Sequence, residues 1–197
     1  MGQRLTLRRL KDLKSDESGA TLVEFTLVLL IMLTMTFGII EFGYAGFQWA
    51  NAEAATQRGV RLAATRDAAI TGIPDCGTGV SGLSPGQPCS DAAGSYTWST
   101  TCNAGAGGAN CNAATLALIV AEMQRSYPDL TAANVNVTFS GAGLGFQGLG
   151  RPVPIVSVEL TGLTFDFIAL DGLIGLPDQI NMPAFRASIT AEDLQGT

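Results

Sequence analysis

Hydrophobic residues form a nearly unbroken run close to the start of the chain. Between Ala20 and Ile40 the only charged residue is Glu24. At about 1.5 Å per residue, a helix over this run measures about 30 Å, which is the thickness of the hydrocarbon core of a bilayer. The pattern therefore predicts one transmembrane helix over residues 20–41.

The helical pattern continues beyond this span, but it becomes two-sided. Glu53, Gln57 and Arg61 fall on one face, whereas small and apolar residues recur on another at spacings of three and four. We expect one continuous helix from about Thr21 to about Ala69, in which residues 42–70 form an amphipathic stem. The small and apolar series consists of Phe42, Ala45, Trp49, Ala52, Ala55, Gly59 and Leu62.

Residues 71–197 carry the signals of a small extracytoplasmic α+β domain. Asn112 can cap a second helix that ends before Pro128, and period-two alternation then predicts about three antiparallel strands. We expect the long helix to pack against this sheet, which makes the fold α+β with a single membrane span. The expected strands are 134–139, 156–167 with a bulge at Gly162, and 185–189, and a glycine-rich link over 141–150 joins the first two.

The charges are distributed unequally around the span. The whole chain has a net charge of −6, but five basic residues precede the span. By the positive-inside rule, this basic leader keeps the N-terminus in the cytoplasm and places the C-terminal domain outside. After Gly19, six basic residues face fourteen acidic ones, which excludes a nucleic-acid surface because phosphates need a basic patch. The five basic residues are Arg4, Arg8, Arg9, Lys11 and Lys14.

All four cysteines, Cys76, Cys89, Cys102 and Cys111, lie in a segment rich in Gly, Ser, Pro, Asn and Thr. We expect residues 73–111 to form a long loop that disulfides staple, because an even number of cysteines outside the membrane meets an oxidising compartment. Of the three connectivities, short loops favour Cys76–Cys89 and Cys102–Cys111. The chain has no histidine and no Cys-x-x-Cys pair, so we expect no zinc.

No signature of catalysis is present. The chain lacks histidine, and it contains no Gly-x-Ser-x-Gly, HExxH or phosphate-loop motif. The acids Asp166, Asp171 and Asp178 could supply calcium ligands, but their spacing fits no loop motif, and solvated turn acids are the plainer interpretation. We therefore expect no enzyme, no catalytic residue, no metal and no cofactor.

Glu24 stands out because a carboxylate within a membrane span costs roughly 2.5 to 3.5 kcal/mol to insert. One interpretation is that it lies at the interface without a function. The other begins from its neighbours, because Gly19, four further residues and Glu24-Phe25 open the apolar run. This pattern resembles the type III signal of type IV pilin-like proteins. The resemblance implies a leader over residues 1–19 that is cut between Gly19 and Ala20, and a new α-amine that pairs with Glu24 of the same or a neighbouring subunit.

The resemblance extends through Gly38-Ile39-Ile40-Glu41-Phe42-Gly43 to the stretch from Ala52 to Ala64. Together these segments resemble the TadE-like pseudopilins of the bacterial tight-adherence (Tad or Flp) pilus. The resemblance implies a structural minor pilin or pseudopilin of the inner membrane, either retained there or incorporated in a pilus. Its implied partners are a prepilin peptidase, other pilins or pseudopilins, the inner-membrane platform and membrane lipid. Many type IV pilins carry phenylalanine where this chain has Ala20, so methylation of the new amine stays open.

Three alternatives remain at this point. A type II secretion pseudopilin shares the signal, and a permanently anchored binding module could use the disulfide loops to hold a ligand. A secretory signal cut after Ala52 would free Glu53, but its apolar run exceeds the roughly 7 to 15 residues usual for signal peptides. The mature N-terminus separates the three classes: Ala20 for a pilin-like protein, Glu53 for a secreted one, and an intact leader for an anchored module.

Overall fold

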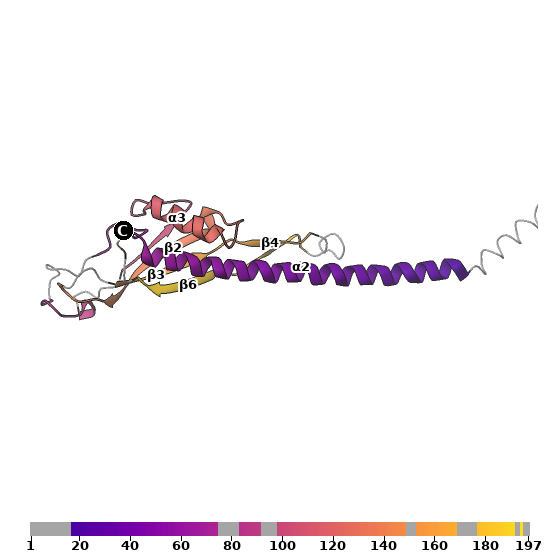
Figure 1. Ribbon diagram of the computed structural model, residues 1–197, viewed down its shortest axis with the longest axis horizontal. Coiled ribbons are helices and arrows are strands. Elements are labelled where there is room, and N and C mark those ends of the chain that lie inside the picture. Colours follow the sequence, from indigo (N-terminus) through magenta and orange to yellow (C-terminus); the bar gives the residue numbers. More distant parts are fainter. Residues whose placement is uncertain are drawn as a thin grey trace, which may run out of the picture. The chain divides into compact units, whose positions relative to one another are not determined.

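The computed structural model describes residues 17–74, 83–91, 98–148, 153–168, 177–191 and 194. Its longest element is helix α2, Glu17–Thr65, which runs without a break for 49 residues (Figure 1). We call residues 19–40 the apolar part of α2 and residues 45–65 its packed part. The expected long helix is confirmed, and it is the candidate membrane span of the described residues.

The chain divides into two compact units. The first consists of Met1–Tyr44 and Asp166–Asp178, and the second of Ala45–Phe165 and Gln179–Thr197. The apolar part of α2 thus belongs to the first unit and the packed part to the second. Sequence patterning placed the whole of residues 71–197 in one domain, whereas the structure groups residues 166–178 with the apolar helix.

A four-stranded antiparallel sheet forms the centre of the second unit. Its strand order is β1-β2-β3-β6, so β2 and β3 pair as neighbours in the middle of the sheet (Figure 1). The α+β class is confirmed, with more strands than the sequence predicted. The strands are β1 (Ser99–Asn103), β2 (Val135–Leu144), β3 (Val153–Leu160) and β6 (Phe185–Thr190).

The core of the second unit lies between this sheet and two helices. In the register of β2 and β3, Val137 faces Val158 and Phe139 faces Val156, and all four side chains are buried. These residues belong to one hydrophobic cluster with the packed part of α2 and with α3, Ala113–Gln124. Alternating residues of the strands thus supply one buried face, as period-two patterning predicts.

The second helix begins where the sequence predicts. The side chain of Asn112 accepts hydrogen bonds from the backbone N–H groups of Ala114 and Thr115, at 3.1 and 3.4 Å. An N-cap of this kind satisfies donors that have no partner within the helix. The apolar residues of α3 that recur at helical spacing are buried: Leu116, Ile119, Val120 and Met123.

Two boundaries differ from the sequence expectation because tertiary pairing competes with local propensity. The helix ends at Thr65 and not near Ala69, since Ala69 and Thr71 exchange backbone hydrogen bonds with residues 110 and 112. Within the expected loop 73–111, Ser99–Asn103 forms β1 by pairing with β2. This strand has one buried residue, Cys102, so it lacks the hydrophobic alternation that would reveal it in the sequence.

The expected strand over 156–167 is also divided in two. Gly162 adopts φ = 69°, in the left-handed region that favours glycine. The strand ends before Gly162 instead of continuing through a bulge. After the break, β4 (Thr164–Asp166) pairs with β5 (Gln179–Asn181) in a separate two-stranded sheet. The first residues of the link expected over 141–150 belong to a strand, because Gly141–Leu144 continues β2 through a register shift.

Candidate functional site on the N-terminal helix

Gly19 and Ala20 lie in the first turns of α2, and both are exposed. A Cβ atom added at Gly19 would have no heavy atom of the described chain within 4 Å. Glycine is about 1 kcal/mol less favourable than alanine in a helix interior, so helix stability does not explain its presence. Within the described structure, no packing contact requires a glycine at position 19, although this position precedes the predicted cut.

Glu24 and Phe25 follow one turn later and are also exposed. Among the described residues, Glu24 has no hydrogen-bond or ion-pair partner within the chain. Residues four apart share one face of a helix, so Glu24 lies on the face of Ala20. The carboxylate is therefore open to a partner from outside, or to a new amine at Ala20.

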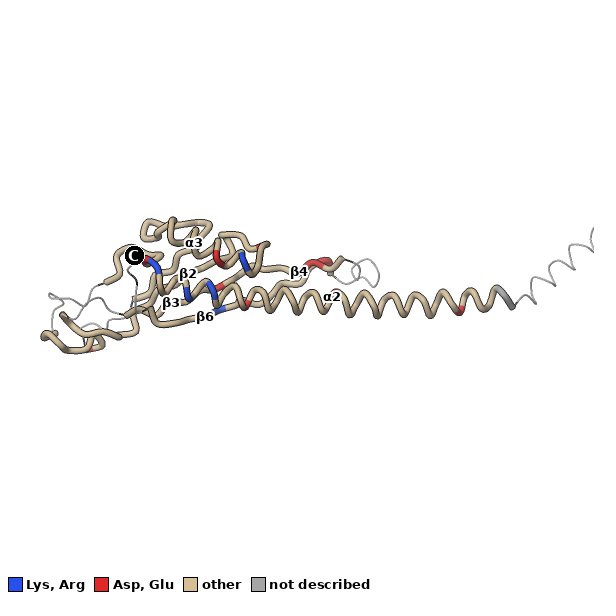
Figure 2. The backbone as a smooth tube through the Cα atoms, in the orientation of Figure 1, with Lys and Arg blue, Asp and Glu red and all other residues tan. Residues whose placement is uncertain are grey.

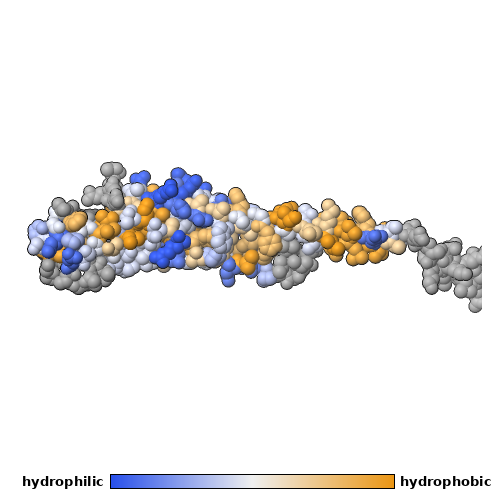
Figure 3. All heavy atoms as spheres, turned by 90° about the horizontal axis from the view of Figure 1, so that it is seen from below, coloured by the Kyte–Doolittle hydropathy of each residue, from blue (hydrophilic) through white to orange (hydrophobic). Residues whose placement is uncertain are grey.

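The apolar part of α2 is suited to lipid along its length. None of its most apolar window is buried within the chain. Three of its threonine side chains are satisfied locally, because the hydroxyls of Thr26, Thr34 and Thr36 donate to carbonyl oxygens three or four residues earlier, at 2.7 to 2.8 Å. Such internal bonds are what a segment needs in a medium without water. Hydrophobic residues (orange) dominate the visible surface of this part (Figure 3).

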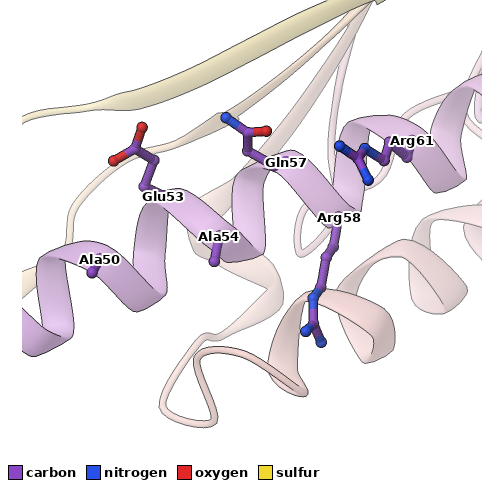
Figure 4. A pocket seen from close by; sticks show the side chains of 6 residues that line it. All are labelled: Ala50, Glu53, Ala54, Gln57, Arg58 and Arg61. Carbon is purple, nitrogen blue, oxygen red and sulfur yellow. The ribbon is translucent and has the colours of Figure 1, made fainter.

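The packed part of α2 presents a second exposed face opposite its buried one. This face forms a shallow depression of about 400 Å³ (Figure 4). Its charged members, Glu53, Arg58 and Arg61, form no ion pair among the described residues. An open surface on a single helix suits contact with another protein better than enclosure of a small molecule. The lining residues are Ala50, Glu53, Ala54, Gln57, Arg58 and Arg61.

This polar face is partly visible in the sequence. Helical spacing already places Glu53, Gln57 and Arg61 together, and Figure 4 shows these three side chains on one side of the helix. Arg58 points to the other side in the same view. Periodicity alone could not tell which face the domain would cover.

The four cysteines lie away from the helix in sequence. Cys102 and Cys111 form a disulfide with Cα atoms 5.8 Å apart, which links β1 to the residue before the N-cap of α3. Cys89 is also disulfide-bonded, and no described cysteine is free. Cys76 lies outside the described residues, so its bridge to Cys89 stays a prediction. The described part of the chain holds no cluster of three or more metal-ligating side chains, and Asp171 lies outside it.

The model of the TadE-like protein family matches residues 19–61. This helical segment is TadE-like. No curated protein and no solved structure matches the chain significantly. The TadE-like family is a structural family related to the Tad pilus, and the match relates this segment of the chain to it.

The limits of the match coincide with features of α2. The TadE-like segment begins at Gly19, contains Glu24 and Phe25, and ends at Arg61, the last residue of the shallow depression. It includes neither the disulfide nor any strand. The similarity thus lies in the helix and does not extend to the remaining domain.

Proposed function

We propose that this chain is a membrane-anchored minor pilin or pseudopilin of a Tad (Flp) pilus or secretion system. A prepilin peptidase matures it by cutting between Gly19 and Ala20. The observation that carries the proposal is that the TadE-like match begins at Gly19 and covers a helix whose apolar part is open on its sides. A structural subunit needs such a surface, because lipid before assembly and neighbouring subunits afterwards must both contact it.

The topology of the proposal follows from charge and redox chemistry. The basic leader stays in the cytoplasm, the apolar part of α2 crosses the inner membrane, and the α+β domain lies on the extracytoplasmic side. An oxidising compartment there supports the disulfide between Cys102 and Cys111. Retention in the inner membrane and incorporation into a pilus both agree with this orientation.

Glu24 acts after the cut. Cleavage leaves a positive α-amine on Ala20, one helical turn before the carboxylate of Glu24. In a medium of low dielectric constant, an unpaired charge is costly, so this amine needs the carboxylate of its own or a neighbouring subunit. The open position of Glu24 leaves both pairings available. The other partners are pilins or pseudopilins, the inner-membrane platform and lipid.

The cut can be tested without disturbing the fold. Gly19→Leu should block maturation, because the peptidase needs a small residue before the cut, whereas an added side chain meets nothing in the described chain. Gly38→Leu is the matched control, since an added Cβ there also has no neighbour within 4 Å. Gel mobility and N-terminal sequencing, with and without the peptidase, give the result. Equal processing of Gly19→Leu and wild type contradicts the proposal.

Glu24→Gln separates insertion from assembly. Removing the charge lowers the cost of insertion, so abundance and cleavage should stay at the wild-type level while co-purification with the pilus machinery falls. Asp129→Asn is the control, because Asp129 is an exposed acidic residue after α3 that has no ion pair among the described residues. If co-purification is unchanged in Glu24→Gln, the carboxylate is only an interface group.

A further inference from the structure

Glu41, which follows the apolar part of α2, differs from Glu24 within that part because Glu41 is buried. It is the first charged residue after Ile40, yet only 6% of its surface is exposed. One carboxylate oxygen accepts a hydrogen bond from the backbone N–H of Ile168, at 3.0 Å. The neighbouring rings of Phe42 and Phe167 meet edge to face, with centroids 6.2 Å apart. Two adjacent contacts therefore join α2 to the chain that follows β4.

These contacts hold Ile168 level with the end of the span. The backbone N–H of Phe167 donates to the carbonyl of Asp178 at 3.0 Å, which brings together the described ends of the connection between β4 and β5. Residues 166–178 accordingly form one compact unit with residues 1–44. Because the apolar part of α2 ends at Ile40, Glu41 lies at the boundary of the proposed span, and Ile168 lies at the same depth.

The side chain of Ile168 is the most exposed large hydrophobic side chain of the described residues, at 81%. Exposure of one apolar residue is ordinary on a protein surface and does not by itself indicate a contact. The position of Ile168 relative to the span is what indicates the contact. Here the backbone of Ile168 is bonded to the residue that follows the span, and exposed Ile39 and Ile40 precede that residue on the helix. Lipid already covers these two residues in the proposed topology.

We propose that Ile168 contacts the lipid bilayer at the outer boundary of the span, as a second membrane contact beside α2. Glu41 is the positioning residue that holds it there. The inference rests on the proposed membrane span. The contact is apolar and not electrostatic, because the described ends of the connection carry the acids Asp166 and Asp178, and acidic residues (red) lie at the end of β4 (Figure 2). A zwitterionic membrane is therefore sufficient.

Quenching by brominated lipid tests this contact in the full-length protein. Ile168→Trp is reconstituted in phosphatidylcholine vesicles whose acyl chains carry bromine near the headgroups. The emission of the introduced tryptophan is the difference between the variant and the wild type, which contains Trp49 and Trp98. Brominated lipid should reduce this emission by a larger fraction in Ile168→Trp than in Leu118→Trp. Leu118 is the matched control, because it is an exposed leucine on α3 in the other compact unit. Equal losses at the two positions overturn the inference.

Three further variants separate the possible causes of failure. Ile31→Trp, in the middle of the apolar part, should be quenched by bromine placed deep in the acyl chains. If this residue is not quenched, the span itself is wrong; if it is quenched and Ile168→Trp is not, only the second contact is wrong. In the Ile168→Trp protein, Glu41→Ala should reduce the loss at position 168 and leave the insertion of α2 unchanged. Glu41→Gln, which retains an oxygen acceptor, should preserve it. Unchanged quenching in Glu41→Ala contradicts the positioning role.

Discussion

The apolar and packed parts of α2 belong to the same helix, but different surroundings determine their residues. A single face of the packed part is buried against the sheet and α3, and Ala52, Ala55 and Ala63 are fully enclosed there. The apolar part has no comparable face within the described chain. Packing within this domain thus constrains the residues of the packed part, whereas no packing within the described chain constrains those of the apolar part.

Glycines show the difference at single positions. A Cβ atom added at Gly59 would lie 2.6 Å from the sulfur of Met123 on α3, whereas at Gly38 it would have no neighbour within 4 Å. A side chain at position 59 would therefore displace the buried side chain of Met123, where two helices of this chain pack closely. Gly38 has no such explanation within the described structure, and its small size matters only for an outside contact.

The largest expected effect tests this contrast directly. Gly59→Leu should lower the free energy of unfolding by about 3 kcal/mol, at the upper end of overpacking effects, because Met123 is buried and has little room to move. Gly38→Leu should leave the unfolding midpoint unchanged. Guanidinium titration in detergent, followed by tryptophan emission, gives both values, since Trp49 and Trp98 belong to the second unit. Similar midpoints for the two variants would remove the distinction between the two regions of the helix.

A second, slightly smaller effect concerns the disulfide of the domain. Replacing Cys102 and Cys111 together by serine should destabilise the second unit by about 2 to 3 kcal/mol, because the bridge no longer restricts the unfolded chain. The apolar part should insert in the membrane as before, since the bridge joins residues that lie outside it. The same titration, combined with carbonate extraction of membranes, measures both outcomes. Loss of membrane insertion would show that the domain and the span are coupled.

The smallest expected effect concerns the N-cap of α3, the helix that packs on the packed part of α2. Asn112→Ala removes the side chain that accepts from Ala114 and Thr115, so it should cost about 1 kcal/mol. Asn110→Ala is the matched control, because the side chain of this exposed asparagine makes no hydrogen bond among the described residues. Equal midpoints in the two variants would mean that the cap does not stabilise α3.

Much of the fold is predictable from local patterns. The long helix, the cap at Asn112, the buried face of α3 and the strands near Val137 and Val158 all follow from periodicity and capping. Three features are not predictable in this way. The polar strand β1 forms only by pairing with β2, and the expected strand over 156–167 is interrupted at Gly162. Residues 69–71 leave the helical pattern and pair with residues near Cys111.

The residues of the candidate site and of the further inference also differ in whether local sequence patterns reveal them. Gly19, Glu24 and Phe25 are visible in the sequence because the proposed cut depends on a short linear pattern, and the family match covers the same residues. The contact between Glu41 and Ile168 is not visible, because it joins residues 127 positions apart. A buried acid after a span resembles an ordinary interface residue until its partner is known.

The sequence by itself determined the apolar length of α2, its TadE-like pattern and the residues beside the predicted cut, because each depends on neighbours along the chain. Only the tertiary structure decided which face of α2 the domain covers, why Gly59 must be small, and that residues 166–178 join the apolar helix. These features depend on the register of strands and on contacts between distant segments. Local periodicity carries no information about either.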